Sequence, residues 1–228
     1  MAFDPGSRSR LTLRDKERFG AETLFDRVAR VVCDADCLPR KELFEAWEVA
    51  RRVRRRFRGG RVVDLAAGHG LLGALMLLLD DTSAHALAID VTTPLSAGRL
   101  TSALTTAWPR LEGRLVRIEG RIEEVAIDSS DLVVSVHACG ALTDRVLDRA
   151  IAGSARVAVL PCCHALDTGD VGGLGGWMDG PLAIDATRAA RLRAQGYIVH
   201  TQTIPEAITP KNRLLLGEPP QGSRARAD

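Results

Sequence analysis

Residues 62–73 read Val-Val-Asp-Leu-Ala-Ala-Gly-His-Gly-Leu-Leu-Gly. A β-branched run enters a glycine turn and then a leucine-rich stretch, which predicts a strand, a tight loop and the start of a helix. From Gly68 the loop has the spacing G-x-G-x-x-G, and Asp90 follows 22 residues later at the end of the next apolar run. Dinucleotides and S-adenosylmethionine both carry a ribose whose hydroxyl groups suit a strand-end carboxylate, so the glycines alone do not distinguish them.

On the C-terminal side of this segment, short apolar runs alternate with helical stretches. We expect strands at residues 61–67, 86–91, 115–119, 132–137, 156–161, 197–204 and 213–218, and helices at 71–79, 94–111, 142–152 and 182–195. The turn carrying Pro205 and Pro210 is too short for a parallel crossover, so the last two strands would be antiparallel. The expected fold is therefore α/β, a Rossmann-like, doubly wound, mostly parallel seven-stranded sheet with an antiparallel last strand.

The N-terminal side of the segment reads as helical. In residues 42–57 apolar side chains recur every three or four positions, and Trp47 is an expected core anchor. We expect an N-terminal helical arm at residues 1–59, the main domain at 60–218 and a disordered tail at 219–228.

Basic residues are concentrated before the glycine loop. Residues 1–61 hold 16 basic and 10 acidic side chains, whereas residues 62–228 hold 15 and 19. Seven of the arginines lie in residues 51–61. They could neutralise RNA phosphates, with Arg54 and Arg55 as candidate contacts, or form a solvated helix face in which Glu48 pairs with Arg52. The sequence leaves both interpretations open.

The composition argues against two classes of protein. Five cysteines, an odd number, without a secretory leader do not suggest a disulfide framework. The longest apolar run, residues 71–79, is about half of the ~20 residues that span a bilayer. We expect a soluble, cytoplasmic protein with no membrane partner.

Three features of the expected sheet favour S-adenosylmethionine over a dinucleotide. Asp64 lies inside the first strand, where a dinucleotide site usually has an apolar residue, Asp90 ends the second strand, and the last two strands are antiparallel. With these features the sequence resembles class I methyltransferases, whose first motif is an acid followed by alternating glycines. Ala66 stands here for the first of those glycines. Taken alone, Asp90 could instead be a helix cap or a turn residue.

This resemblance implies S-adenosylmethionine as the cofactor. Asp64 would help to hold its methionine moiety and Asp90 its ribose, while the backbone after the third strand would face the adenine. Amides at the start of the helix can receive its carboxylate. The cofactor-binding residues expected from the sequence are Asp64, Ala66, Gly68, His69, Gly70, Asp90, Gly120, Arg121, Ile122 and His137.

The fourth and fifth expected strands both end in histidine and cysteine. They read His-Ala-Cys-Gly-Ala-Leu-Thr-Asp at 137–144 and Pro-Cys-Cys-His at 161–164. With Thr-Pro-Lys-Asn-Arg at 209–213, these segments resemble the methyltransferase-32 type domain, seen in eukaryotic tRNA acceptor-stem 2′-O-methyltransferases and in uncharacterised methyltransferase-like proteins. The resemblance covers about residues 40–218. It implies methyl transfer and gives weak support to RNA, tRNA in particular, as the acceptor.

The carboxyl ends of parallel strands meet at one edge of a sheet, so these side chains are expected near the cofactor. The candidate catalytic residues are His137, Cys139 and His164, the last as an acid or base. Candidate acceptor contacts, besides the two arginines, are Cys163, Trp177, Lys211 and Asn212. The glycine-rich segment around Trp177 is either a lid over the acceptor or an ordinary solvent loop.

Zinc binding and thiolate catalysis are competing roles for the cysteines. No C-x-x-C occurs, and adjacent Cys162 and Cys163 would point to opposite faces of a strand, so we expect no metal. Two other functions stay open: an NAD-dependent oxidoreductase on a similar sheet, and a non-catalytic RNA-binding or regulatory protein with a decayed cofactor pocket. RNA, protein and small molecules are all candidate acceptors.

Overall fold

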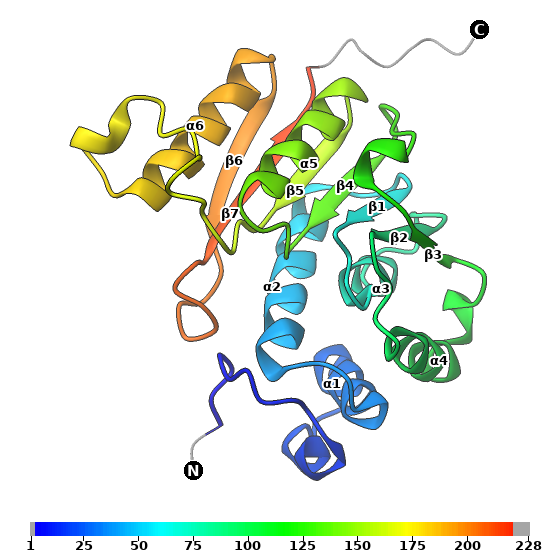
Figure 1. Ribbon diagram of the computed structural model, residues 1–228. Coiled ribbons are helices and arrows are strands. Elements are labelled where there is room, and N and C mark those ends of the chain that lie inside the picture. Colours follow the sequence, from blue (N-terminus) through cyan, green and yellow to red (C-terminus); the bar gives the residue numbers. More distant parts are fainter. Residues whose placement is uncertain (1–2, 221–228) are drawn as a thin grey trace, which may run out of the picture.

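The computed structural model describes residues 3–220, which form a seven-stranded sheet flanked by helices (Figure 1). The strands are β1 Val62–Leu65, β2 Ala86–Asp90, β3 Leu115–Glu119, β4 Leu132–Ser135, β5 Arg156–Val159, β6 Ile198–Thr203 and β7 Arg213–Glu218. Their order across the sheet is β3-β2-β1-β4-β5-β7-β6. The first five strands are parallel, and β7 runs antiparallel to both β5 and β6. The expected fold class and the antiparallel end of the sheet are confirmed.

The helices cover the two faces of the sheet in two groups. They are α1 Leu24–Ala35, α2 Arg40–Arg56, α3 Leu71–Leu78, α4 Ala97–Ala107, α5 Ala141–Ala152 and α6 Gly180–Ala194. Apolar residues of α1 to α4 share one buried cluster with one face of the strands, and those of α5 and α6 share another with the opposite face. Alternate residues of one strand, such as Val133 and Val134, therefore enter different clusters.

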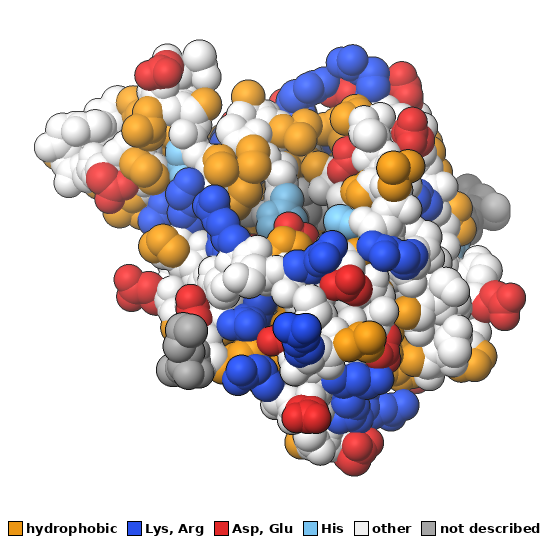
Figure 2. Space-filling model, turned by 60° about the horizontal axis from the view of Figure 1, so that its bottom comes forward, with side chains coloured by type: hydrophobic (Ala, Val, Ile, Leu, Met, Phe, Trp, Pro, Cys, Tyr) orange, Lys and Arg blue, Asp and Glu red, His pale blue; other side chains and the backbone are white. Residues whose placement is uncertain are grey.

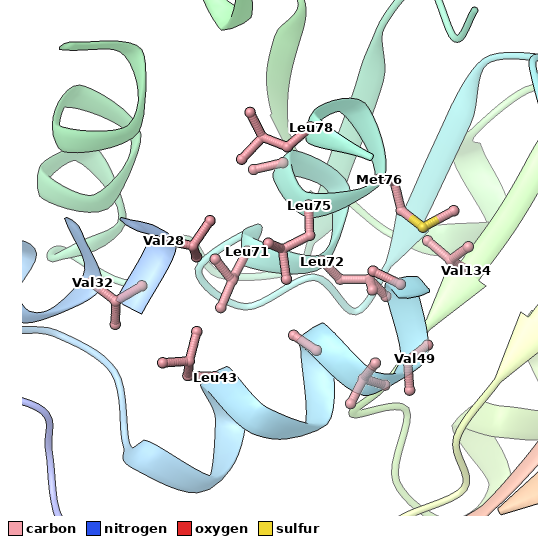
Figure 3. Packing of buried hydrophobic residues seen from close by; sticks show 14 of the residues in the cluster. Val28, Val32, Leu43, Val49, Leu71, Leu72, Leu75, Met76, Leu78 and Val134 are labelled. Atoms are coloured by element: carbon pink, nitrogen blue, oxygen red, sulfur yellow. The ribbon is translucent and has the colours of Figure 1, made fainter. Parts of the chain in front are cut away.

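The larger cluster joins the N-terminal helices to the sheet (Figure 3). This cluster contains Val28 and Val32 of α1, Leu43 and Val49 of α2, several leucines of α3, and Val134 of β4. Trp47 is partly buried and packs against Phe25, with ring centroids 5.2 Å apart and ring planes tilted by 54°. The domain limits expected from the sequence stay predictions, and residues 221–228 of the expected tail lie outside the described residues.

Several expected elements have different limits, among them the strands expected at 132–137 and 156–161, which end at Ser135 and Val159. Two of the differences have clear local reasons. The helix expected at residues 94–111 is α4 followed by a short 3-10 turn, Pro109–Leu111, because proline has no N–H to continue an α-helix. The strand expected at 61–67 ends at Leu65, and the next residue, Ala66, has a left-handed backbone. Within residues 3–220, no helix combines the length and the apolar character needed to cross a membrane.

Candidate functional site

The loop between β1 and α3 turns sharply at the carboxyl edge of the sheet. Ala66, Gly68 and Gly70 have φ angles of 56°, 51° and 75°. At Gly70 the left-handed backbone requires glycine, and a β-carbon there would also lie 3.2 Å from Cβ of Ala88 and 2.8 Å from the flexible end of Arg117. A β-carbon on Gly68 would meet no atom within 4 Å, which leaves this part of the loop open to a ligand.

Asp90 ends β2 beside this loop. Its Oδ2 accepts a hydrogen bond of 2.9 Å from the N–H of Gly68. The carboxylate lines a cavity of about 120 Å³, here called the Asp90 pocket, together with Ala66, Arg121, Ile122, Leu142 and Arg145. Arg121 and Ile122, both expected from the sequence, therefore lie at this pocket. Gly120 instead donates its backbone N–H to the carbonyl oxygen of Asp90, at 2.9 Å.

Asp64 lies deeper, with 2% of its surface exposed. Its Oδ2 accepts a hydrogen bond of 3.0 Å from the N–H of Gly73, which fixes the first turns of α3 to β1. Burial raises the pKa of Asp64 to about 7. Asp64 lines a narrow cavity of about 30 Å³, here called the Asp64 pocket, and Ala66 lines both this pocket and the Asp90 pocket.

Residues before and within α2 close the Asp64 pocket from the other side. Leu38 and Glu42 line it, as does His69 from the glycine loop. Nε2 of His69 lies 2.8 Å from Oγ of Ser96. Burial lowers the pKa of His69, and the nearby Arg117 and Arg99 charges lower it further, so this imidazole is neutral at pH 7.

A larger hollow of about 350 Å³, here called the thiol cleft, opens beyond the ends of β4 and β5. Its lining comes from distant parts of the sequence and includes Arg8, Lys41, His137, Cys162, Cys163 and Lys211. His137 and Glu42 line both the thiol cleft and the Asp64 pocket, so the three cavities follow one another along the edge. Figure 2 shows Lys and Arg side chains gathered around histidine on this face of the molecule.

His137 occupies the boundary between two of these cavities. It keeps an exposed surface toward them, yet the surrounding protein atoms and the charge of Lys41 lower its pKa to about 4. The imidazole is therefore neutral over the physiological range. It can accept a hydrogen bond or a proton, but as a weak base.

Three cysteine sulfurs meet beside the cleft, and two of them, those of Cys162 and Cys163, belong to residues that line it. Sγ of Cys139 lies 3.2 Å from Sγ of Cys162, which lies 3.9 Å from Sγ of Cys163, and all three are within 4.8 Å of one another. Cys162 and Cys163 would point to opposite faces only within a strand, and this condition is not met, because β5 ends at Val159. Cys139 is exposed, Cys163 is half-buried and Cys162 is buried.

The three thiols have different acidities. Burial raises the pKa of Cys139 and of Cys162 above the ordinary thiol value. Hydrogen bonds from the Cys139 and Cys162 thiols lower the pKa of Cys163, and the Lys211 ammonium, whose Nζ lies 3.9 Å from its sulfur, lowers it further. Cys163 is therefore the most acidic of the three.

A buried ionic network holds the two loops that carry these thiols. The side chain of Arg188 on α6 is 3% exposed. It donates to both carboxylate oxygens of Asp144, at 3.0 and 2.7 Å, and to the carbonyl oxygen of Gly140 at 3.0 Å. The N–H of Gly140 in turn donates to the carbonyl oxygen of Cys163 at 3.1 Å. Arg188 thereby fixes the loop after β4 against the loop after β5.

His164 belongs to the same network and not to the cleft. Its side chain is 2% exposed, and Nε2 lies 2.8 Å from Oδ1 of Asp185. Asp185 also accepts from Arg188 at 3.3 Å and from Arg213 at 2.7 Å. Asp185 occupies only Nε2, and the buried Nδ1 of His164 has no hydrogen-bond partner among residues 3–220. The expected role of His164 as an acid or base on the acceptor stays a prediction, although its side chain does not line the cleft.

Two candidate acceptor contacts lie apart from the cleft lining. Trp177, on the segment before α6, is 87% exposed. Nδ2 of Asn212 donates to the carbonyl oxygen of Ile204 at 3.0 Å and closes the turn between β6 and β7. Asn212 thus shapes the turn that presents Lys211, and Lys211 and Cys163 are the two candidate acceptor contacts that do line the cleft.

The arginine run is mostly committed to ion pairs and backbone contacts. Arg54 is 2% exposed, pairs with Asp80 at 3.0 Å and donates to Oγ of Ser83 at 2.7 Å. Its expected role as an RNA contact is therefore wrong, because its guanidinium joins the end of α2 to the end of α3. Arg52 pairs with Glu48, as one interpretation of the run predicts, and Arg55 is exposed.

Sequence reasoning missed four residues of the site: Arg8, Lys41, Glu42 and Arg188. The first three reach the cavities only because the N-terminal segment and α2 pack across the carboxyl edge. Arg188 and Asp185 stand three positions apart on an alanine-rich helix, a spacing that equally fits an exposed ion pair. The sequence carries no signal that this pair is buried.

Known proteins were compared with the whole chain. A family model described as a methyltransferase domain matches residues 42–167. No curated protein matches the chain. An O-methyltransferase family protein from Burkholderia thailandensis is similar in structure, with a TM-score of 0.54 and 19% identity over 95% of this chain and 66% of that one. The mitomycin 7-O-methyltransferase MmcR gives a TM-score of 0.51 and 16% identity over 90% of this chain and 60% of that one.

The two kinds of similarity support different statements. The chain spans about two thirds or less of the length of these two structures, and at such low identity they show a shared class I methyltransferase fold. The family model covers more than half of the chain, including the glycine loop, Asp90 and both thiol-bearing segments. The chain belongs to the methyltransferase-32 domain family.

Proposed function

We propose that the protein is an S-adenosylmethionine-dependent methyltransferase that binds this cofactor along the Asp90 and Asp64 pockets and its methyl acceptor in the thiol cleft. One observation carries the proposal: Ala66 lines the first two pockets, and His137 and Glu42 line both the second pocket and the cleft. A ligand extending from Asp90 past Ala66 would bring its far end beside His137.

The residues at the first two pockets fit this cofactor. Asp90 would accept hydrogen bonds from both ribose hydroxyls, and the apolar side chain of Ile122 would face the adenine. The open space above Gly68 admits the ligand against the backbone. Asp64, when ionised, attracts the positive charge of the methionine end. When bound, S-adenosylmethionine supplies an electrophilic methyl group on its sulfonium.

The chain's own contribution to the reaction would be alignment and proton acceptance. Methyl transfer needs the acceptor nucleophile held in line with the methyl group, and the acceptor then loses one proton. Glu42 is the better candidate to receive it, because burial and the neighbouring Glu45 raise its pKa, whereas His137 is a weaker base. His137 would orient the acceptor through its neutral imidazole.

The cleft lining has a small excess of positive charge, which favours an anionic acceptor. Its cations are Arg8, Lys41 and Lys211, its carboxylates are Glu42 and Glu45, and Lys41 lies 3.2 Å from the carboxylate of Glu45. A phosphate or carboxylate on the acceptor would contact these cations. RNA is one such acceptor, but most of its expected support, the arginine run, is used in structural contacts.

Cofactor choice is tested by thermal shift with S-adenosylhomocysteine and with NADH. We expect S-adenosylhomocysteine to raise the melting temperature and NADH to leave it unchanged. A shift with NADH alone would establish the oxidoreductase alternative. A shift with neither ligand would support a decayed cofactor pocket and overturn the proposal.

The acceptor is tested with S-adenosylmethionine carrying a radiolabelled methyl group. Total RNA and a fraction of small anionic metabolites are supplied separately, and incorporation into each is counted. We expect Lys211→Ala to lower kcat/KM on the labelled fraction by about tenfold, since a charged hydrogen bond is lost. Lys16→Ala is the matched control, because Lys16 pairs with Asp34 outside the cleft. Equal losses in both variants would remove the anionic-acceptor assignment.

A further inference from the structure

The three thiols at the cleft are the right distance apart to share one metal ion. A tetrahedral centre with Zn–S bonds of about 2.3 Å holds its sulfurs about 3.8 Å apart. The observed Cys139–Cys162 and Cys162–Cys163 separations of 3.2 and 3.9 Å bracket that value, and no pair exceeds 4.8 Å. In residues 3–220, no other three His, Cys, Asp or Glu donors lie as close together.

The backbone around the thiols is already fixed. Gly140 donates to the carbonyl oxygen of Cys163, and the hydroxyl of Thr143 donates to the carbonyl oxygen of Ala138. Arg188 holds the same loop through Gly140 and Asp144. These contacts position Cys139 against the next loop before any ligand arrives, which lowers the ordering cost of binding.

Charge near the thiols also suits a metal thiolate. Lys211 Nζ lies 3.9 Å from the Cys163 sulfur, and Lys41 lines the same cleft. Three thiolates and one Zn²⁺ carry a net charge of −1, which these ammonium groups would offset. A disulfide would use only two of the three sulfurs and would leave the most acidic thiol, Cys163, without a role.

We propose that Cys139, Cys162 and Cys163 bind one zinc ion as three thiolates, with the fourth position open toward the thiol cleft. Binding converts three S–H groups to three S–Zn bonds and releases three protons, with no change of oxidation state. Water would fill the fourth position, and an oxygen, nitrogen or sulfur atom of a molecule in the cleft could replace it. Zinc at this position would lower the pKa of the water, hydroxyl or thiol group that it binds.

The test uses the full chain, reduced and stripped with a chelator. After incubation with Zn²⁺ and removal of the excess, elemental analysis should find about one zinc per chain. Replacement by Co²⁺ should give thiolate-to-cobalt charge-transfer absorption. Cys163→Ser and Cys139→Ser should each weaken Zn²⁺ binding by about tenfold or more and reduce that absorption, because one of the three sulfur ligands is lost.

Cys37→Ser is the matched control, because Cys37 is a buried thiol of the N-terminal region outside the cleft. It should keep full zinc content. S-adenosylhomocysteine binding, measured on every variant, reports folding and the cofactor pocket separately from the metal.

Three results would overturn the zinc site. One is a reduced chain that takes up less than about a tenth of an equivalent of zinc. Another is equal zinc loss in Cys37→Ser and Cys163→Ser. The third is a chain that takes up no zinc when reduced and forms a Cys139–Cys162 disulfide on mild oxidation, which would make the cluster a redox pair.

Discussion

At the β1–β2 end of the carboxyl edge, the groups that line the Asp90 pocket come from the glycine loop, the end of β2, the segment after β3 and the start of α5. At the β4–β5 end, the groups that line the thiol cleft come from the N-terminal segment, α2, two loops and the β6–β7 turn. The first end depends on backbone conformation at Ala66, Gly68 and Gly70, whereas the second depends on a buried ionic network centred on Arg188. A substitution should therefore act locally at the first end and collectively at the second.

The largest effect is expected for Arg188→Ala. The change leaves Asp144 and Asp185 without their buried cation, and we expect the free energy of unfolding to fall by about 3 kcal/mol. Urea denaturation at pH 7 measures it. Arg191→Ala, on the more exposed side of the same helix, should cost about 1 kcal/mol or less. Equal stability of the two variants would contradict the collective role of Arg188.

Asp90→Ala should act on ligand binding and leave the thiol cleft intact. We expect the affinity for S-adenosylhomocysteine to fall about thirtyfold, or about 2 kcal/mol, through loss of charged hydrogen bonds to the ribose. Calorimetry measures the affinity. Asp81→Ala, an exposed aspartate away from the pocket, is the control. Unchanged affinity in Asp90→Ala would remove the cofactor assignment, and lost zinc binding would show that the two ends are coupled.

Asp64 should make cofactor binding depend on pH. Because its pKa is about 7, the carboxyl is mostly protonated at pH 6 and mostly ionised at pH 8. The ionised form attracts the ammonium group of S-adenosylhomocysteine, so its affinity should rise severalfold, up to about tenfold, between these pH values. Calorimetry at both pH values measures it. Asp64→Asn should lose the dependence, and a wild-type affinity that does not change with pH would contradict a contact with Asp64.

The same carboxyl has an opposite effect on stability. Its folded pKa of about 7 lies above the ordinary value of 3.8, so the folded chain binds the proton more tightly than the unfolded chain. The Asp64 contribution to the free energy of unfolding therefore falls as pH rises from about 4 to about 7. Relative to wild type, Asp64→Asn should gain stability over that interval.

The smallest effect is expected for Ala66→Gly. Ala66 has a φ of 56°, which costs an alanine about 1 kcal/mol and a glycine almost nothing. Glycine also has more conformational entropy in the unfolded chain, which offsets part of this relief. We therefore expect the free energy of unfolding to rise by under about 1 kcal/mol. Ala67→Gly lacks this relief and should destabilise by a similar amount. Chemical denaturation of both variants measures the free energy of unfolding. A lower value for Ala66→Gly than for wild type would contradict backbone strain at Ala66.

The fold and the first end of the site are largely predictable because their signals are local. The glycine spacing, the acid in β1 and the acid that ends β2 all lie within residues 62–90, and the short β6–β7 turn forces an antiparallel pair. The second end is not predictable in the same way. Whether His164 faces a substrate or Asp185, and whether Arg54 faces RNA or Asp80, depends on packing between elements far apart in the chain.

The insertion of β7 between β5 and β6 has a consequence for the order of folding during synthesis. β6 is made first but can join the sheet only through β7, to which it is hydrogen-bonded. Thr209, Pro210 and Lys211, in the turn between these strands, form one wall of the thiol cleft. Folding proceeds from the N-terminus as the chain emerges. A ribosome-bound chain could thus form the Asp90 and Asp64 pockets while the thiol cleft still lacked a wall.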